Sequence, residues 1–245
     1  MQFYLHFSVH NLTLPLAYSY PLQSLLYRLM YPDPAYSAQV HDAGHSDGRR
    51  SFKLFCFGPL MGAHRVDRDR REITFFSEVL LEVRTPDPRL AVVWQAALEP
   101  GLELELRGQP LVLDGVEADQ QAIAASQCKI QAVSPILAYR SYEEAGVRRM
   151  KYYTPLDPEF QALVVQNFQG KYRALTGREP GALELTALTV GARDKVVTQH
   201  KGTRLTGWRG RYLLRGDAEA LSFLYDAGLG AKNAAGFGLF HLLEG

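Results

Sequence analysis

Residues 228–238 read GLGAKNAAGFG, with two Gly-x-Gly pairs separated by five residues. An amphipathic helix is predicted to end at Ala227, and a strand is predicted to begin near Gly236. Glycine permits positive φ angles and lets another backbone approach closely, so the segment predicts a tight loop against a ligand or a neighbouring element. P-loops and dinucleotide-binding fingerprints follow a strand and open a helix. This segment follows a helix and precedes a strand, so it fits neither motif. A structural turn, with Gly228 ending the helix, is the alternative interpretation.

The elements before this loop, together with the strand after it, form one half of a repeated order. Hydrophobic periodicity and aspartate N-caps predict helices over residues 157–175 and 217–227. The same patterns predict strands over residues 129–134, 183–190, 195–200, 204–215 and 236–243. The order strand, helix, strands, helix, strand is typical of a βαββαβ unit.

The first half of the chain predicts the same order without detectable sequence repetition. Residues 2–10 alternate Phe3, Leu5, Phe7 and Val9, which indicates a half-buried strand. Helices are predicted over residues 21–31 and 88–98, and strands over residues 51–60, 71–81, 102–106 and 111–116. The two units predict an α+β fold of two tandem ferredoxin-like (RRM-like, βαββαβ) domains, residues 1–122 and 128–245.

Composition excludes several classes of protein. The 245 residues are 47% hydrophobic and 22% charged, which is typical of a globular chain. No apolar run is long enough to span a bilayer and the first residues do not resemble a secretory signal, so we expect no membrane partner and a cytoplasmic location. Cys56 and Cys128 are too few for a disulfide framework or a zinc site, and we expect no metal or other cofactor.

Charge is distributed unevenly although the net charge is only +1. Residues 1–127 contain 11 Lys and Arg against 15 Asp and Glu, whereas residues 128–245 contain 16 against 11. Residues 191–215 contain seven cations and one anion, which is typical of a surface for a polyanion but also of a merely solvated cationic hairpin. Trp208 and Tyr212 lie among these cations, where they could stack on bases.

The helix, the two Gly-x-Gly pairs and the final strand together resemble the C-terminal signature of the CRISPR-associated repeat-RNA processing endoribonucleases, of the RAMP superfamily. The first half is similar to that family at YSYPLQSLLY (residues 18–27), VHD (40–42), FKLF (52–55) and GPL (58–60). Ser134-Pro135 is a further family-like feature. The resemblance spans residues 14–60, 130–135 and 190–240, and it implies two tandem ferredoxin-like domains.

The resemblance implies a metal-independent endoribonuclease that matures CRISPR RNA. In this reaction the RNA 2′-hydroxyl attacks the neighbouring phosphorus and expels the 5′-oxygen, which leaves a 2′,3′-cyclic phosphate and a 5′-hydroxyl. The protein must move two protons, align the attack and stabilise negative charge. The implied partner is CRISPR repeat RNA, as precursor and as mature guide. Association with an interference complex, and a monomer or homodimer, are left open.

Three residues of the first half are the candidate catalytic groups. Tyr27 lies outside the leucine arc of its predicted helix, so its phenol is available to a ligand. His41 is expected on a polar, glycine-containing loop, where an imidazole can act as acid or base. Lys53 is expected at the start of the second strand, as a cation that stabilises negative charge. The family resemblance implies that Tyr27 helps to orient or deprotonate the 2′-hydroxyl.

Alternatives remain for two of these roles. His45 is a second candidate for the acid or base, and Arg49 or Arg50 could replace Lys53. RNA binding is expected from the basic segment and the glycine loop, at Arg193, Lys195, Lys201, Arg204, Arg209, Arg211, Gly228, Gly230, Lys232, Asn233, Gly236 and Gly238. The glycine loop could instead support the interface between the domains.

A second interpretation is a non-catalytic RAMP subunit that holds guide RNA in an interference complex. Such a subunit would share the fold and the glycine loop, but it would not need the set Tyr27, His41 and Lys53. The presence of these three in the order of the family favours catalysis. A purely structural interaction protein would leave the cationic segment unexplained.

Overall fold

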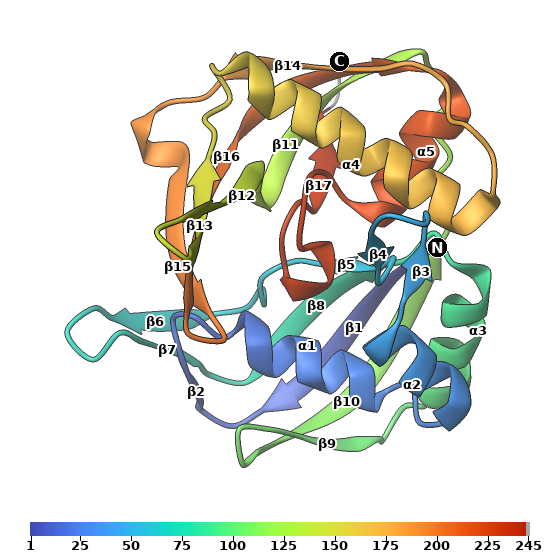
Figure 1. The fold of residues 1–245 in the computed structure, drawn as a ribbon. Helices are drawn as coiled ribbons and strands as arrows, with labels where there is room; N and C mark the ends of the chain where they lie inside the picture. The colour runs from blue at the N-terminus through green and yellow to red at the C-terminus, as the bar shows by residue number, and fades with distance from the viewer. Residues whose placement is uncertain (244–245) are drawn as a thin grey trace.

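The computed structural model describes residues 1–243, which form two α+β halves (Figure 1). The antiparallel sheet of the first half contains, in spatial order, β5 (Cys56–Phe57), β8 (Glu78–Arg84), β1 (Gln2–Val9), β10 (Gln109–Asp119) and β9 (Glu103–Leu106). Its helices are α1 (Ser19–Arg28), α2 (Pro34–Asp42) and α3 (Pro88–Ala97). No helix within residues 1–243 is long and apolar enough to cross a membrane.

The second half repeats this topology. Its antiparallel sheet contains, in spatial order, β14 (Leu183–Thr189), β16 (Thr203–Gly216), β11 (Gln127–Ile136) and β17 (Phe240–Leu242), and β15 (Lys195–His200) also pairs with β16. Its helices are α4 (Pro158–Thr176) and α5 (Ala218–Ala227). In both sheets the first strand of the unit lies between the third and the fourth, so the predicted ferredoxin-like fold class is confirmed.

Each half has its own apolar core because its helices bury one face on the sheet. In the first half the leucines of α1 and the alternating Phe3, Leu5 and Phe7 of β1 are buried together. In the second half α5 begins at its predicted cap, where the Asp217 carboxylate accepts from the Ala220 amide at 2.7 Å. Cys56 is a buried free thiol.

Several predicted strands are shorter than expected. The strand predicted over residues 51–60 is interrupted at Leu54, where φ is +50°, and only β4 (Ser51–Phe52) and β5 form. The strand predicted over residues 71–81 divides into β8 and β7 (Glu72–Phe75), and β7 joins a separate sheet with β2 (Leu12–Pro15) and β6 (His64–Asp67). The predicted last strand begins only at Phe240, and residues 244–245 lie outside the described residues.

One hairpin was not predicted at all. It consists of β12 (Tyr139–Glu144) and β13 (Val147–Tyr152), which pair with each other between β11 and α4 in the chain. Most of its residues are exposed, so the sequence has no alternation of apolar and polar residues to reveal the two strands. A short pair of strands, β3 (His45–Ser46) and β4, precedes the interruption at Leu54.

A buried ionic network joins the two halves. Arg84 of β8 is fully buried, and its Nη1 donates to the carbonyl oxygens of Tyr225 (3.1 Å) and Phe240 (2.9 Å) in the second half. Its guanidinium lies 3.7 Å from the centre of the Tyr225 ring. Glu82 forms an ion pair with Arg84 and also lies 2.6 Å from Nε2 of His241. The glycine loop between α5 and β17 lies against the first half beside this network (Figure 1).

Candidate functional site

Helix α2 places His41 at its exposed end. The Asp33 carboxylate accepts from the Tyr36 amide at 3.0 Å and Pro34 occupies the first helical position, which together start the helix. Tyr36 and Val40 bury one side of it, four residues apart. The helix continues through His41, so the prediction that His41 lies on a loop was wrong. The polar and glycine residues that suggested a loop begin only after this last turn.

The side chains of Tyr27 and His41 lie against each other. Their ring centres are 5.1 Å apart in an edge-to-face arrangement, and the Tyr27 ring also contacts Phe55 at 5.6 Å. Burial raises the pKa of Tyr27 to about 12. The phenol therefore keeps its proton at neutral pH and can donate a hydrogen bond to a ligand.

His41 is positioned by its sequence neighbour. Its Nδ1 lies 2.8 Å from Oδ1 of Asp42, and 61% of the His41 side chain is exposed. A carboxylate can only accept a hydrogen bond, so Nδ1 carries the hydrogen in this contact. The other nitrogen, Nε2, then has the lone pair of the neutral ring. An exposed imidazole with one nitrogen held in this way can take up or deliver a proton at the other.

Lys53 reaches the same place from the other side. It follows β4 in the turn before Leu54, and its Nζ donates to the carbonyl oxygen of His41 at 2.6 Å. Burial lowers the pKa of Lys53, and the nearby Asp42 carboxylate opposes this shift. The prediction that Lys53 opens a regular strand was wrong, because the chain turns away from β4 directly after Phe52. This turn brings the ammonium to the end of α2.

Gly44 allows the two segments to approach each other. Its φ is +67°, and a Cβ atom at this position would lie 2.5 Å from the carbonyl oxygen of Phe52. A larger residue would separate the end of α2 from the segment that contains Lys53. The structure thus brings Tyr27, His41 and Lys53 together through one close backbone contact.

The alternative histidine lies elsewhere. Nε2 of His45 is 2.7 Å from Oδ2 of Asp87, and only 17% of its side chain is exposed. The same carboxylate also accepts from the Tyr36 hydroxyl and caps α3 through the Arg89 amide at 2.9 Å. His45 therefore joins β3 to the start of α3 and does not contact Tyr27.

The glycine loop is an internal support rather than an open cradle. Gly228, Gly230 and Gly238 are buried, which leaves them little surface for the RNA contact that was predicted. Asn233 is only 8% exposed, and its Nδ2 donates to the carbonyl oxygens of Leu229 and Phe237, both at 3.0 Å. These contacts favour the alternative prediction, in which the loop supports the interface between the halves.

The remaining two residues of the loop differ from each other. Gly236 is half-buried, and a Cβ atom there would meet the Phe57 ring of the first half at 2.9 Å. Lys232 is exposed at the tip of the loop, directly before the short 3-10 helix η2 (Asn233–Ala235). Of the predicted loop residues, Lys232 has the side chain most open to a ligand.

Lys171 holds this loop from inside, and the sequence patterns did not reveal it. It lies on α4, is 2% exposed, and donates from Nζ to the Gly228 carbonyl oxygen and to Oδ1 of Asn233 (3.0 Å). Burial lowers the pKa of Lys171 to about 7. The lysine occupies a position on the apolar face of α4, which is the only sequence signal that could have identified it.

The basic segment is largely open to solvent. The exposed cations there are Arg193, Lys195, Lys201, Arg204, Arg209 and Arg211, and within residues 1–243 none of these six forms an ion pair with a carboxylate. Lys201 lies at the tip of the β15–β16 hairpin, with Nζ 4.8 Å from the centre of the Tyr20 ring in α1. The hairpin therefore reaches the first half.

The two aromatic residues of this segment have different environments. Trp208 is half-buried, with Lys195 Nζ 6.0 Å from its ring centre. Tyr212 is fully buried and its ring stacks on Phe160 of α4 at 6.4 Å. The prediction that Tyr212 stacks on bases was wrong, because its position on β16 faces the helices and not the solvent.

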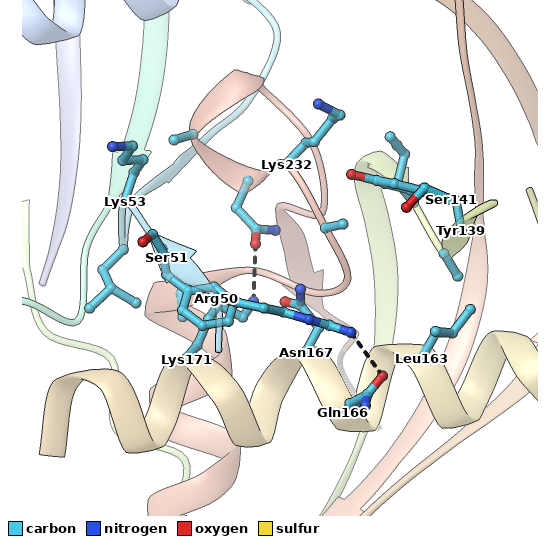
Figure 2. A pocket seen from close by; sticks show the side chains of 18 of the residues that line it. Arg50, Ser51, Lys53, Tyr139, Ser141, Leu163, Gln166, Asn167, Lys171 and Lys232 are labelled. Carbon is cyan, nitrogen blue, oxygen red and sulfur yellow. Dashed lines mark hydrogen bonds between the residues drawn. The ribbon is translucent and has the colours of Figure 1, made fainter. Parts of the chain in front are cut away.

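A cleft with a volume of about 770 Å³ lies next to the candidate catalytic group. Its walls come from the segment around Lys53, the start of β12, helix α4 and the tip of the glycine loop. Figure 2 shows Lys232 at the tip of the glycine loop, between Lys53 on one side and Tyr139 on the other, with Arg50 extended over α4 toward Gln166. Of the three candidate catalytic residues, Lys53 lines this cleft, and it links the cations of the cleft to the exposed imidazole through its contact with His41.

The second half of the chain identifies its family. Residues 117–242 match the family described as CRISPR associated protein Cas6, C-terminal. The chain belongs to the Cas6 family. No curated protein matches the sequence.

Solved structures of Cas6 and related proteins share the whole fold of this Cas6-family chain. A Cas6-related protein from Pyrococcus furiosus is 16% identical, with a TM-score of 0.85 over 100% of this chain and 98% of that one. A structure described as an RAMP protein binding different RNA substrates is 17% identical, with a TM-score of 0.84 over 100% of both chains. A Cas6 product complex is 19% identical, with a TM-score of 0.69 over 99% of this chain and 100% of that one.

Proposed function

We propose that this Cas6-family protein is a metal-independent endoribonuclease that binds CRISPR repeat RNA and cleaves precursor CRISPR RNA in the cytoplasm. The observation that carries the proposal is the meeting of Tyr27, His41 and Lys53, from three separate segments, at one exposed site. Membership of a CRISPR-associated family supports the class of substrate. A Cas6 product complex among the similar structures is consistent with it.

Each of the three residues has a role that fits its surroundings. The Tyr27 phenol, which is protonated at neutral pH, donates a hydrogen bond that orients the 2′-hydroxyl. Nε2 of the neutral His41 ring takes the proton from the 2′-oxygen, and the imidazolium that forms delivers it to the departing 5′-oxygen. Lys53 stabilises the charge that develops on the phosphorane oxygens. The 2′-oxygen forms its bond to phosphorus as the bond to the 5′-oxygen breaks.

We propose a division of labour between the halves. Residues 1–122 contribute the catalytic group, and residues from 128 onward contribute most of the cations that bind the RNA backbone. The six exposed cations of the basic segment, which form no ion pair with a carboxylate among residues 1–243, support this division. The buried network around Arg84 fixes the two halves relative to each other, as a site divided between them requires.

A non-catalytic RAMP subunit is the second candidate function. One of the similar structures is described as an RAMP protein that binds different RNA substrates, and it has the same fold over the full chain. Such a protein would bind RNA through the same basic surface but would leave it intact. The meeting of Tyr27 and Lys53 at His41 favours the enzyme.

The decisive experiment is single-turnover cleavage of labelled repeat RNA in EDTA. We expect products with a 2′,3′-cyclic phosphate and a 5′-hydroxyl. The same RNA with 2′-deoxyribose at the nucleotide before the cut should bind but resist cleavage. Activity that disappears in EDTA and returns with Mg²⁺ would contradict the mechanism, and intact RNA under all conditions would favour the non-catalytic subunit.

A further inference from the structure

The lining of the cleft between the halves is strongly basic. Six cationic side chains line it, and none of the described residues that line it is Asp or Glu. They are Arg50, Lys53, Arg140, Arg148, Lys171 and Lys232. Lys171 is enclosed by carbonyl oxygens and Lys53 contacts His41, so the other four have charges that are free for a ligand.

Three of these cations come from three separate segments of the chain. Arg50 lies between β3 and β4 in the first half, Arg148 lies on β13, and Lys232 lies at the tip of the glycine loop. Arg50 donates to the Gln166 side-chain oxygen and Arg148 to the Ser141 hydroxyl, both at 3.3 Å. These partners are neutral. Within residues 1–243, none of the three cations forms an ion pair with a carboxylate.

The next residue along β13 shows the contrast. Arg149 forms an ion pair with Glu144 at 2.6 Å and does not line the cleft. Neighbouring residues of a strand point to opposite faces, so Arg148 and Arg149 lie on different sides of the same hairpin. The hairpin thus has a neutralised arginine on one face and an unpaired arginine on the face toward the cleft.

The cations of the cleft also act on one another. Burial lowers the pKa of Lys232, and the charges of Lys201 and Arg148 lower it further. Like charges held close together without counter-ions repel each other, and a bound polyanion removes this cost. A ligand with several negative charges in a row therefore fits the cleft better than a single anion.

We infer that this cleft holds the RNA phosphates directly next to the scissile one, with Arg50, Arg148 and Lys232 as their ligands. The inference rests on the proposed function, because Lys53 belongs both to the cleft wall and to the catalytic group. Ligand pockets in proteins are about 300–1,000 Å³ in volume, so a cleft of about 770 Å³ accommodates a few nucleotides of one strand. The β12–β13 hairpin forms one wall and closes on the strand from the second half.

The test compares Arg50→Ala and Arg148→Ala with the control Arg149→Ala. The probe is labelled repeat RNA made uncleavable by 2′-deoxyribose before the cut, and its affinity is measured over a range of KCl concentrations. Each cleft variant should bind about 10-fold more weakly, since it loses a hydrogen bond to a charged group. The slope of log affinity against log salt should also fall by about 0.7 for each lost phosphate contact. Arg149→Ala should match the unaltered protein in both respects.

A second measurement locates the contact on the RNA. Single methylphosphonate linkages, which are uncharged, are placed in turn at the phosphates around the cut. In the unaltered protein, one or more linkages beside the cut should weaken binding, and in Arg148→Ala at least one of these linkages, the one that Arg148 contacts, should have little further effect. Binding by both cleft variants that equals that of Arg149→Ala would overturn the inference.

The two proposals fail in different ways. If RNA binds through Arg50 and Arg148 but is never cut, the proposed activity is wrong and the cleft remains a binding site. If RNA is cut normally and the cleft variants bind it with unchanged affinity and salt slope, the proposed activity holds and the cleft is not the binding site. All three substituted arginines have solvent-exposed side chains, so unchanged melting temperatures verify that the variants are folded.

Discussion

The two halves of this molecule have the same strand order but differ in the segment that joins the first strand to the second. In the first half this segment is divided into α1 and α2 by Pro32-Asp33-Pro34. In the second half it contains one helix of 19 residues, α4, which lies along the sheet (Figure 1). The divided segment ends in a short helix whose last turn is exposed, and the continuous helix buries its side chains on the core.

This difference separates the residues of the proposed catalytic group from the residue that supports the glycine loop. The division allows His41, on α2, to lie against Tyr27 of α1, so two helices contribute to one site. In α4 the ionisable residue Lys171 instead points inward and fixes the glycine loop. A shared topology therefore does not determine which half contributes the proposed catalytic group, because the connection between the first two strands determines which side chains are exposed.

Removing the imidazole from the divided segment should have the largest effect. We expect His41→Ala to reduce the single-turnover cleavage rate by about 10²–10⁴-fold with little change in RNA affinity, as for a lost general acid or base. Tyr27→Phe and Lys53→Ala should also reduce the rate more than the affinity. The measurements are cleavage time courses at saturating protein, with affinity determined on uncleavable RNA.

His45→Ala is the matched control for that experiment. It should lower the melting temperature, since it removes one of the hydrogen-bond partners of the buried Asp87 carboxylate, but cleavage by the folded fraction should persist. Normal cleavage by His41→Ala combined with loss of cleavage in folded His45→Ala would transfer the catalytic role to His45.

Breaking the network between the halves should be strongly destabilising. Arg84→Ala removes the arginine partner of the buried Glu82 and the contacts of Arg84 with the second half, and we expect the free energy of unfolding to fall by about 3–5 kcal/mol. Urea denaturation gives this value. Arg89→Ala is the control, because that arginine forms its ion pair with Asp33 at the surface and should have a small effect. Similar effects of the two substitutions would show that the network does not stabilise the interface.

The supporting role of the glycine loop can be tested with two glycines that both have positive φ. Gly230 has φ +66° and a Cβ atom there would lie 2.5 Å from the Leu137 carbonyl oxygen, whereas Gly202 has φ +78° and open space around it. Gly202→Ala should cost only backbone strain of about 1–2 kcal/mol. Gly230→Ala should cost clearly more in the same denaturation experiment. An equal loss of stability in the two variants would mean that the glycine loop accommodates the extra Cβ atom at no additional cost.

The basic half should control affinity and not rate. Alanine at Arg193 with Lys195, or at Arg209 with Arg211, should lower the slope of log affinity against log salt by about 0.7 per phosphate contact removed. RNAs of different sequence should be weakened alike, and the cleavage rate of bound RNA should hardly change. If both double variants keep the original affinity and slope, these strands do not bind the RNA.

The smallest predicted effect concerns His200 at the tip of the β15–β16 hairpin. Burial lowers the pKa of His200 to about 4, with further contributions from Lys232 and Lys201. The unfolded chain, with a histidine pKa of about 6.5, therefore binds a proton in this range that the folded protein does not bind. Stability should thus fall as the pH decreases from about 6.5 to about 4.

The variant His200→Gln isolates this contribution. Its melting temperature should fall less than that of the unaltered protein over the same range of pH, because the side chain no longer titrates. An identical decline in both proteins would show that other groups cause it.

Sequence patterns predicted much of the fold and the composition of the site. The periodicities of β1, α1, α4 and α5 are long and regular, and they gave both βαββαβ units. The resemblance to the repeat-RNA endoribonucleases selected Tyr27, His41 and Lys53, which the structure brings together. The β12–β13 hairpin escaped prediction because it is exposed on both faces, where no burial pattern is required.

Errors arose where a local pattern was overridden by contacts between distant residues. Tyr212 lies among arginines in the sequence, but strand alternation turns it into the core. His41 was expected on a loop, but its last helical turn is stabilised by the burial of Tyr36 and Val40. For the glycine loop two roles were predicted, RNA binding and support of the interface, and the bonds from Asn233 and Lys171 to its carbonyl oxygens favour the second.

The sequence by itself determined the order of helices and strands, the class of fold and the residue types available for chemistry. These follow from periodicity, capping and turn residues, which act over a few neighbouring positions. Only the tertiary structure decided that His41 and not His45 lies beside Tyr27, and that Arg148 and not Arg149 faces the cleft. Neighbouring positions differ because a strand or helix directs successive side chains to different sides. The packing of the two halves then determines which of these sides faces the cleft.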